Sequence, residues 1–312
     1  MNWRLKAAIQ NAISLLPKSL SYPAYYWVQR HFGTLKQPDV EAGLRAGVQT
    51  WRRLLAVGAK PIGKTFFEVG TGRMPLVPMS YWLMGAKHTT TVDLNPYLRE
   101  DLTNEALSWI ASNRRRVEDL FGTLLFEDRL DTLISFYEDQ QFDLAELFNL
   151  CKITYIAPGD AARTKLPDSS VDFHTSYNVF EHIPLKVLRK ILEEGNRIVR
   201  KGGLFAHRID YSDHFSHSDP SISAIHFLRF SDFVWRLYSG NRYMYMNRLR
   251  HDDFVELFRS AGHTILLNEP DENPTVLELL KSGEAKLNRK FAGKTFETLS
   301  ITGAWFVTKK EA

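Results

Sequence analysis

Glu68-Val-Gly-Thr-Gly72 ends an apolar run that begins at Phe66, and Asp93 later ends a second strand-like run, Thr89-Thr-Thr-Val-Asp93. A glycine turn after a strand brings bare backbone N–H groups and the N-terminus of a helix close to a ligand. An acid at the end of the next strand can bind the two hydroxyls of a ribose. The two features together predict a site for an adenosine-containing cofactor.

The glycine turn differs from the fingerprint of nicotinamide dinucleotide sites, which places glycine at its first, third and sixth positions. Counted from Gly70, the sixth position is Pro75. A nicotinamide-dependent oxidoreductase is therefore the weaker alternative. An acid two residues before the first glycine, followed by Gly-x-Gly, resembles motif I of class I S-adenosylmethionine-dependent methyltransferases.

The resemblance continues downstream in the order of the methyltransferase motifs. Gly159-Asp-Ala161 follows an apolar stretch and is similar to the third-strand turn of the family. Tyr177-Asn-Val-Phe-Glu-His-Ile183 resembles the fourth-strand motif of the quinone-biosynthesis branch, also called methyltransferase type 11. The resemblance covers residues 60–210 and implies an enzyme with S-adenosylmethionine as its cofactor.

The resemblance also implies roles for individual residues. In the family, the glycine loop wraps the amino-acid end of the cofactor and the acid of motif I lies nearby. The acids after the second and third strands bind the ribose and the adenine amine. The cofactor-binding residues predicted in this way are Glu68, Gly70, Thr71, Gly72, Asp93, Leu94, Asp160, Ala161, Tyr177 and Asn178. The chain departs from the family at Arg73-Met-Pro75, where many members carry another small residue.

The alternation of strand-like and helix-like segments predicts a Rossmann-like α/β fold, with a mostly parallel sheet and helices on both faces. Strands are expected near residues 64–70, 88–94, 153–158, 171–178 and 204–210, before an antiparallel pair at 264–267 and 301–308. A helix at 184–200 should end at Gly202-Gly203. The predicted domains are an N-terminal helical cap, 1–59, and a methyltransferase domain, 60–312.

Two insertions interrupt this plan, at residues 101–150 and 211–250. The apolar spacing of the first predicts two or three helices. Because ligands of open α/β sheets bind beyond the carboxyl ends of the strands, both insertions are candidate lids. The second lies in a stretch without lysine but rich in arginine and aromatic residues. Either these arginines bind a carboxylate or phosphate of the acceptor, or they pair with nearby aspartates.

Histidines gather after the expected fifth strand, between His207 and His217. A histidine with a pKa near neutrality can take the proton of an acceptor hydroxyl as the methyl group arrives. His214 and His217 are therefore the leading catalytic candidates, and His182 is the next. For each of them, a hydrogen-bonding role that orients the loop is the alternative.

In some related methyltransferases, including small-RNA 2′-O-methyltransferases, acids and histidines near this place hold a divalent ion, and the resemblance points to Glu181, His182 and Asp210 as such a set. Their spacing is not diagnostic, and a histidine that orients helix 184–200 is the simpler interpretation, so the sequence predicts no metal. The predicted acceptor is small and polar or anionic, with O-methylation of a sugar or glycolipid precursor as the first choice. A non-catalytic cofactor-binding or membrane-associated scaffold is a further alternative.

The composition of the chain bears on the size of its core, its binding partners and its location. The chain has 312 residues, 44% of them hydrophobic, which is enough for a large core. The net charge is +4, but acidic and basic residues are interspersed, so no nucleic-acid partner is predicted. The single cysteine, Cys151, cannot form an intramolecular disulfide, which suits a cytoplasmic protein.

Residues 2–16 form a basic amphipathic pattern. This helix either packs as a cap against the domain, which is the favoured interpretation, or makes peripheral contact with a membrane surface. No apolar run reaches the roughly 18 residues of a transmembrane helix, so no span is predicted.

Overall fold

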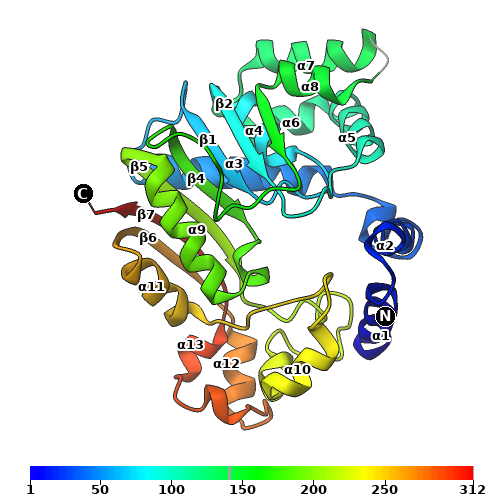
Figure 1. Cartoon of the computed structure of the whole chain (residues 1–312), viewed down its shortest axis with the longest axis vertical. Coiled ribbons are helices and arrows are strands. Elements are labelled where there is room, and N and C mark those ends of the chain that lie inside the picture. Colours follow the sequence, from blue (N-terminus) through cyan, green and yellow to red (C-terminus); the bar gives the residue numbers. More distant parts are fainter. Residues whose placement is uncertain (140–141, 312) are drawn as a thin grey trace.

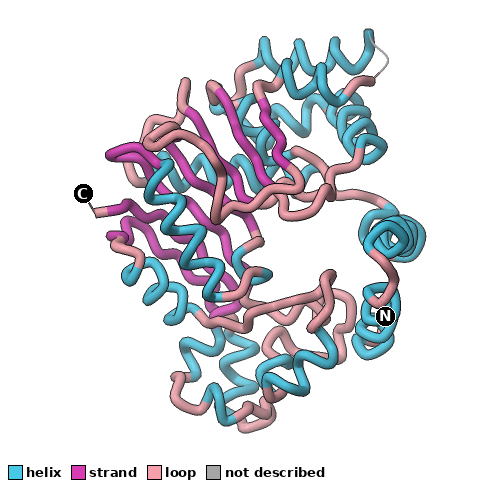
Figure 2. Tube along the Cα trace, viewed as in Figure 1, coloured by secondary structure: helices cyan, strands magenta, loops and turns pink. Residues whose placement is uncertain are grey.

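A computed structural model describes residues 1–139 and 142–311. Within these residues, seven strands form one sheet in the order β3-β2-β1-β4-β5-β7-β6 (Figures 1 and 2). The strands are β1 (Thr65–Val69), β2 (His88–Val92), β3 (Ile153–Ile156), β4 (Val171–Tyr177), β5 (Val199–Asp210), β6 (His263–Glu272) and β7 (Ile301–Lys310). β1 to β5 are parallel, whereas β7 runs antiparallel to both β5 and β6. The predicted mostly parallel sheet with an antiparallel last strand is confirmed.

Helices cover both faces of this sheet and extend beyond its carboxyl edge (Figure 1). They are α1 (Trp3–Ser14), α2 (Lys18–Phe32), α3 (Val40–Ala56), α4 (Leu76–Leu83), α5 (Glu100–Ser112), α6 (Arg114–Phe121), α7 (Glu127–Asp139), α8 (Leu144–Leu150), α9 (Leu185–Ile198), α10 (Asp232–Ser239), α11 (His251–Ser260), α12 (Pro274–Lys281) and α13 (Phe296–Ser300).

Adjacent side chains of β1 enter two different cores, because successive side chains of a strand point to opposite faces. Phe66 stacks on Trp51 of α3 and Tyr81 of α4. Phe67 lies on the other face, in the apolar cluster that includes residues of α9 and α11. The central strand is therefore held from both sides, which fixes the position of the glycine loop that follows it.

Two local predictions need correction. Gly202 does not end α9, which stops at Ile198; it has a φ of 82° and lies inside β5, where the register against β4 shifts. This glycine serves a bulge of the strand. Residues 101–150 contain four helices in their described part, α5 to α8, rather than two or three. The chain breaks at Asn113, whose φ is −124°, and this break separates α5 from α6.

The N-terminal helix packs against the second insertion. Trp3 of α1 lies against Tyr238 of α10, with ring centroids 4.8 Å apart, and its backbone N–H donates to Asp219 at 2.8 Å. α3, in contrast, packs directly on the sheet through Trp51. None of the helices in the described ranges is long and apolar enough to cross a bilayer.

Candidate active site

The loop after β1 closes tightly against the segment after β4. Gly70 and Gly72 have φ values of 90° and 74°, in the left-handed region that favours glycine. A Cβ atom at Gly70 would lie only 2.5 Å from Cγ2 of Val179. The backbone N–H of Gly70 donates to the carbonyl of Val92 at 2.9 Å. Val92 ends β2 and Val179 follows β4, so the two strands that flank β1 in the sheet both shape this loop.

Asp93 follows β2 and lies beside the glycine loop, where the sequence placed it. The backbone N–H of Gly72 donates to Oδ2 of Asp93 at 3.1 Å, and the Tyr155 hydroxyl is 3.5 Å from the same oxygen. Burial raises the pKa of Asp93 to about 7, although hydrogen bonds from Gly72 and Thr71 oppose the shift. Both the protonated and the ionised form of this carboxyl group are therefore populated at neutral pH.

Glu68 is buried inside β1, with 1% of its surface exposed. Its Oε2 accepts hydrogen bonds from the hydroxyls of Tyr81, at 3.2 Å, and Thr175. Oε1 has no hydrogen-bond partner among the described residues. Burial raises the pKa of Glu68 to about 8. This acid therefore retains a proton at neutral pH unless a cation approaches Oε1.

Both acids and the glycine loop line one cavity of about 670 Å³. This volume falls within the range of about 300–1,000 Å³ that is typical of small-molecule sites. The cavity lies beyond the carboxyl ends of β1, β2 and β4, which is where open α/β sheets bind ligands. The outer wall comes from other parts of the chain and includes Tyr25, Gln29, Tyr97, Arg242, Tyr243 and Tyr245.

Most of the predicted cofactor residues share this cavity, namely Glu68, Gly70, Thr71, Gly72, Asp93, Tyr177 and Asn178. Leu94, Asp160 and Ala161 are not part of its wall. Leu94 is 71% exposed, and Oδ1 of Asp160 accepts the backbone N–H of Ala162 at 2.9 Å. Ala161 packs in the apolar cluster of Phe67. Cofactor contacts of these three residues stay predictions of the resemblance.

The three predicted catalytic histidines come from two separate stretches and lie in one row. Ring centroids are 4.8 Å apart for His182 and His214, and 4.9 Å apart for His214 and His217. Of the three, His182 lines the cavity. Its Nδ1 lies 2.8 Å from the carbonyl oxygen of Tyr245. Burial, followed by the neighbouring His214, lowers the pKa of His182 to about 4, so its ring is neutral at neutral pH.

The arginines of the second insertion and its flank divide into two groups. Arg248 and Arg250 are buried and donate to backbone carbonyls, a role that neither interpretation of the sequence predicted. Arg248 also pairs with Asp232. Arg242 instead lines the cavity, together with Arg73 of the glycine loop. Only these last two are placed to meet a ligand of this cavity.

The sequence analysis missed the contribution of α2 to the cavity wall. Tyr25 of α2 stacks on Tyr243, with ring centroids 3.9 Å apart. Arg73 donates to Oε1 of Gln29 at 2.8 Å. The run of aromatic residues at 22–27 was the available signal, since a helix that only covers a core rarely needs so many amphipathic rings.

The two insertions differ in their relation to the cavity. Arg242, Tyr243 and Tyr245 of the second insertion line it, whereas none of the described residues of 101–150 does. α5 to α8 pack instead beside α3, α4 and β3. Of the two insertions, therefore, the second alone lies where it could cover the cavity as a lid.

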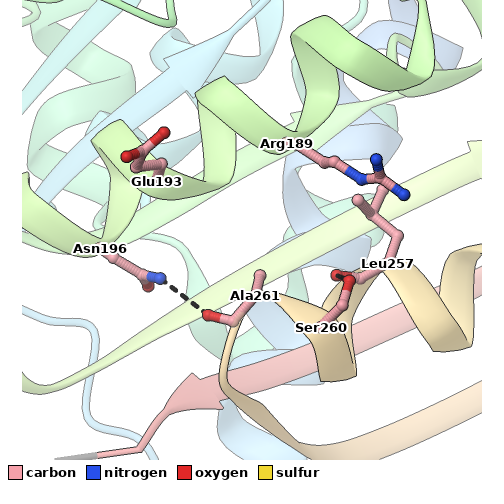
Figure 3. A pocket seen from close by; sticks show the side chains of 6 residues that line it. All are labelled: Arg189, Glu193, Asn196, Leu257, Ser260 and Ala261. Carbon is pink, nitrogen blue, oxygen red and sulfur yellow. Dashed lines mark hydrogen bonds between the residues drawn. The ribbon is translucent and has the colours of Figure 1, made fainter.

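A second hollow, of about 390 Å³, lies between α9 and α11 (Figure 3). Nδ2 of Asn196 donates to the carbonyl of Ala261 at 3.0 Å and ties the two helices together. The walls are formed by Arg189, Glu193, Asn196, Leu257, Ser260 and Ala261. This hollow shares no wall residue with the first cavity and lies away from the glycine loop, so we do not consider it a catalytic site.

Comparison with known proteins agrees with the geometry. Residues 68–207 match the family model described as a methyltransferase domain. Similar solved structures include an S-adenosylmethionine-dependent methyltransferase from Methanosarcina mazei, 12% identical, covering 82% of this chain and 96% of that one, with a TM-score of 0.47. Another is geranyl diphosphate C-methyltransferase from Streptomyces coelicolor A3(2), 10% identical, covering 84% and 78%, with a TM-score of 0.47. No curated protein matches the sequence.

The family match and the motifs assembled at the strand ends define the class of this protein. Residues 68–207 hold a class I S-adenosylmethionine-dependent methyltransferase domain. The protein is accordingly an enzyme whose cofactor is S-adenosylmethionine.

Proposed function

We propose that S-adenosylmethionine binds with its amino-acid end at Glu68 and Gly70 and its ribose at Asp93. The unpartnered, buried Oε1 of Glu68 supports this orientation, because an ammonium group there would pair with a carboxyl oxygen that has no other partner among the described residues. A Cβ atom at Gly72 would meet nothing within 4 Å, so the glycine loop leaves room for the cofactor there, which supports this orientation as well. In this orientation the adenosine part extends toward β2 and β3.

We further propose that the acceptor is a small polar or anionic molecule that is methylated on a hydroxyl oxygen. The observation that carries this proposal is the outer wall of the cavity, where Arg73 and Arg242 stand among tyrosines. A guanidinium forms paired hydrogen bonds with carboxylates and phosphates, and tyrosine rings combine an apolar face with a hydroxyl. A sugar, a glycolipid precursor or a hydroxy acid has these complementary groups.

The chemistry needs little beyond alignment, because the cofactor already carries an activated methyl group. An oxygen lone pair of the acceptor forms the new bond to the methyl carbon as the carbon–sulfur bond breaks. The sulfur keeps the electron pair of that bond and S-adenosylhomocysteine leaves. Holding the three atoms in line supplies most of the rate, and the hydroxyl proton passes to a base. His182 is the histidine of the predicted row that reaches the cavity.

The test is transfer of an isotopically labelled methyl group from S-adenosylmethionine to a panel of sugars, hydroxy acids, amines and neutral alcohols. NMR chemical shifts of the transferred methyl carbon distinguish oxygen, nitrogen and carbon acceptors. We expect O-methylation of anionic or polyhydroxylated compounds. Arg242→Ala should raise KM for an anionic acceptor, whereas Arg236→Ala, an exposed arginine outside the cavity, should not. Exclusive methylation of amines or carbon would overturn the proposal.

We also propose that α1 makes peripheral contact with anionic membranes, which would suit a glycolipid acceptor. Large apolar side chains are exposed around this helix: Leu5 is 55%, Leu16 41% and Leu20 60% exposed. Arg4 and Lys18 are exposed on the same part of the chain. Wild type should sediment with anionic vesicles, and Leu5→Asp should reduce this binding. Equal recovery of both proteins with vesicles would refute the contact.

A further inference from the structure

Helices α1, α2 and α10 share an outer face on which large apolar side chains are exposed. The side chain of Asn11 in α1 donates to the carbonyl of Leu237 in α10 at 2.8 Å, so these two helices lie side by side (Figure 1). α2 follows α1 after a short turn at residues 15–17. Apolar side chains gathered in this way mark contact with another surface. The exposed apolar residues of this outer face are Leu5, Leu15, Leu16, Leu20, Trp27, Phe233 and Leu237.

α2 carries the outer face on one side and the wall of the first cavity on the other. Tyr25 and Gln29 lie one turn apart and line the cavity. Leu20 and Trp27 are exposed, and at 3.6 residues per turn they point about 140–160° away from Tyr25. An α-helix with its side chains is about 10–12 Å across. A single helix therefore separates the outer face from the cavity.

The N-terminal part of this face has charge of one sign. Residues 1–38 contain five lysine or arginine residues and no aspartate or glutamate. Arg4 and Lys18 are exposed beside the apolar side chains. The one acid of α10, Asp232, is held in two salt bridges. An apolar face bordered by basic residues fits an anionic bilayer, because apolar groups insert among the headgroups while the cations attract the lipid charge.

The mouth of the cavity adjoins the outer face at Arg242. This residue lines the cavity and is also exposed. Its Nη2 donates to the carbonyl of Ser14, the last residue of α1, at 3.0 Å. A guanidinium has five N–H donors, so this bond leaves others for a ligand. Leu15, which follows Ser14, is 87% exposed. An anionic group bound to Arg242 would therefore lie beside the apolar turn between α1 and α2.

We propose that the enzyme binds an anionic bilayer through this outer face, and that its acceptor is a lipid whose polar headgroup enters the cavity past Arg242. The apolar chains of the lipid stay in the bilayer, beside Leu15 and Leu20. This inference rests on the proposed function and names the substrate class. A headgroup hydroxyl oxygen forms the bond to the methyl carbon as the carbon–sulfur bond breaks, the sulfur keeps the electron pair, and the hydroxyl proton passes to a base.

Bilayer binding can be measured without turnover. The full chain is sedimented with vesicles of phosphatidylcholine alone and of phosphatidylcholine mixed with phosphatidylglycerol. We expect wild type to bind the mixed vesicles only, and high salt to weaken this binding. Lys18→Glu should weaken it at least about tenfold, because attraction to the lipid charge becomes repulsion. Leu20→Asp should weaken it at least about tenfold as well, because a charged side chain does not insert among the headgroups.

Leu20→Asp has a matched control at the opposite edge of the sheet. Leu20 is 60% exposed, and Ile62, which precedes the amino end of β1, is 62% exposed. Ile62→Asp should sediment with vesicles as wild type does. Lys18 and Leu20 both lie in the first turn of α2, where an acid favours the helix, so both variants should fold. Calorimetry with S-adenosylhomocysteine should give the same affinity in all four proteins.

The lipid acceptor is tested with labelled S-adenosylmethionine and matched pairs of compounds. Phosphatidylglycerol, phosphatidylinositol, glucosyl diacylglycerol and, as an amine, phosphatidylethanolamine are presented in anionic vesicles, each beside its water-soluble headgroup. We expect the label in the lipid phase. For at least one hydroxyl-bearing lipid, kcat/KM should exceed that of its soluble counterpart at least about tenfold, because the bilayer concentrates enzyme and acceptor on one surface. Leu20→Asp should lose this advantage, whereas Ile62→Asp should keep it.

Each part of the proposal has its own contrary result. Equal sedimentation of wild type, Lys18→Glu and Leu20→Asp with the mixed vesicles would overturn the bilayer contact. A dimer that Leu20→Asp alone dissociates would show that a second copy covers the outer face instead. Soluble headgroups methylated on oxygen as fast as their lipids, or no methylated lipid at all, would overturn the lipid acceptor. Lipids methylated on nitrogen or carbon alone would refute the proposed O-methylation and keep the lipid acceptor.

Discussion

The ribose role of Asp93 gives the most direct test of the cofactor site, through the isosteric change Asp93→Asn. A carboxylate can accept both ribose hydroxyls, and a hydrogen bond to a charged group contributes about 1.5–3 kcal/mol. The amide offers one acceptor and no charge. A loss of about 3 kcal/mol corresponds to roughly 100-fold weaker binding, since 1.4 kcal/mol is tenfold.

Calorimetry with S-adenosylhomocysteine measures this loss without turnover. The fold should survive, because the amide can still accept the backbone N–H of Gly72, which lies 3.1 Å from Oδ2 in wild type. Asp131→Asn, a similar change at a side chain that is 57% exposed on α7, is the control and should leave affinity unchanged. Affinity within threefold of wild type in a folded Asp93→Asn variant would refute the assignment.

The pH dependence of binding checks the same assignment independently. Burial raises the pKa of Asp93 to about 7, so a falling share of the free protein carries the carboxylate as the pH drops below that value. If the cofactor binds the carboxylate, its apparent affinity should weaken toward a limit of tenfold per pH unit below about pH 7. Asp93→Asn should lack this component of the pH dependence. Identical profiles in both proteins would show that another group titrates.

Three further changes probe parts of the structure around the cavity. Burial raises the pKa of Glu68 from 4.5 to about 8, so between these pH values the folded state keeps a proton that the unfolded chain releases. The free energy of unfolding should therefore fall as the pH rises from about 4.5 to about 8. Glu68→Gln should remove that slope in urea unfolding measured across pH. Gly70→Ala should weaken cofactor binding at least tenfold, because its Cβ would meet Val179, and Val179→Ala in the same chain should restore part of the affinity. Arg250→Leu should cost about 3 kcal/mol or more of unfolding free energy, because buried carbonyls lose their donor.

Local patterns were sufficient to predict the strands and the meeting of Gly70 with Asp93. Both lie directly after adjacent parallel strands, so their neighbourhood follows from the order β2-β1 alone. The contact of Tyr25 with Tyr243 could not be predicted in this way. It joins segments more than two hundred residues apart in the chain, and no periodicity in either segment encodes the other. The meeting of Glu181 with His214 likewise depends on how the loop after β5 folds back over the short helix Phe180–His182.

The arginine-rich composition of the second insertion shows why a residue count misleads about function. In this region long segments lack regular secondary structure, and their buried carbonyls need donors from elsewhere. Arg250 supplies donors to three carbonyls at once, and Arg248 to two. A guanidinium has five N–H groups in a fixed plane and is more weakly hydrated than an ammonium, so lysine cannot replace it there. These two buried arginines therefore report how this region is stabilised, and the region in turn positions Asn247 against the carbonyls of Phe180 and Ile183.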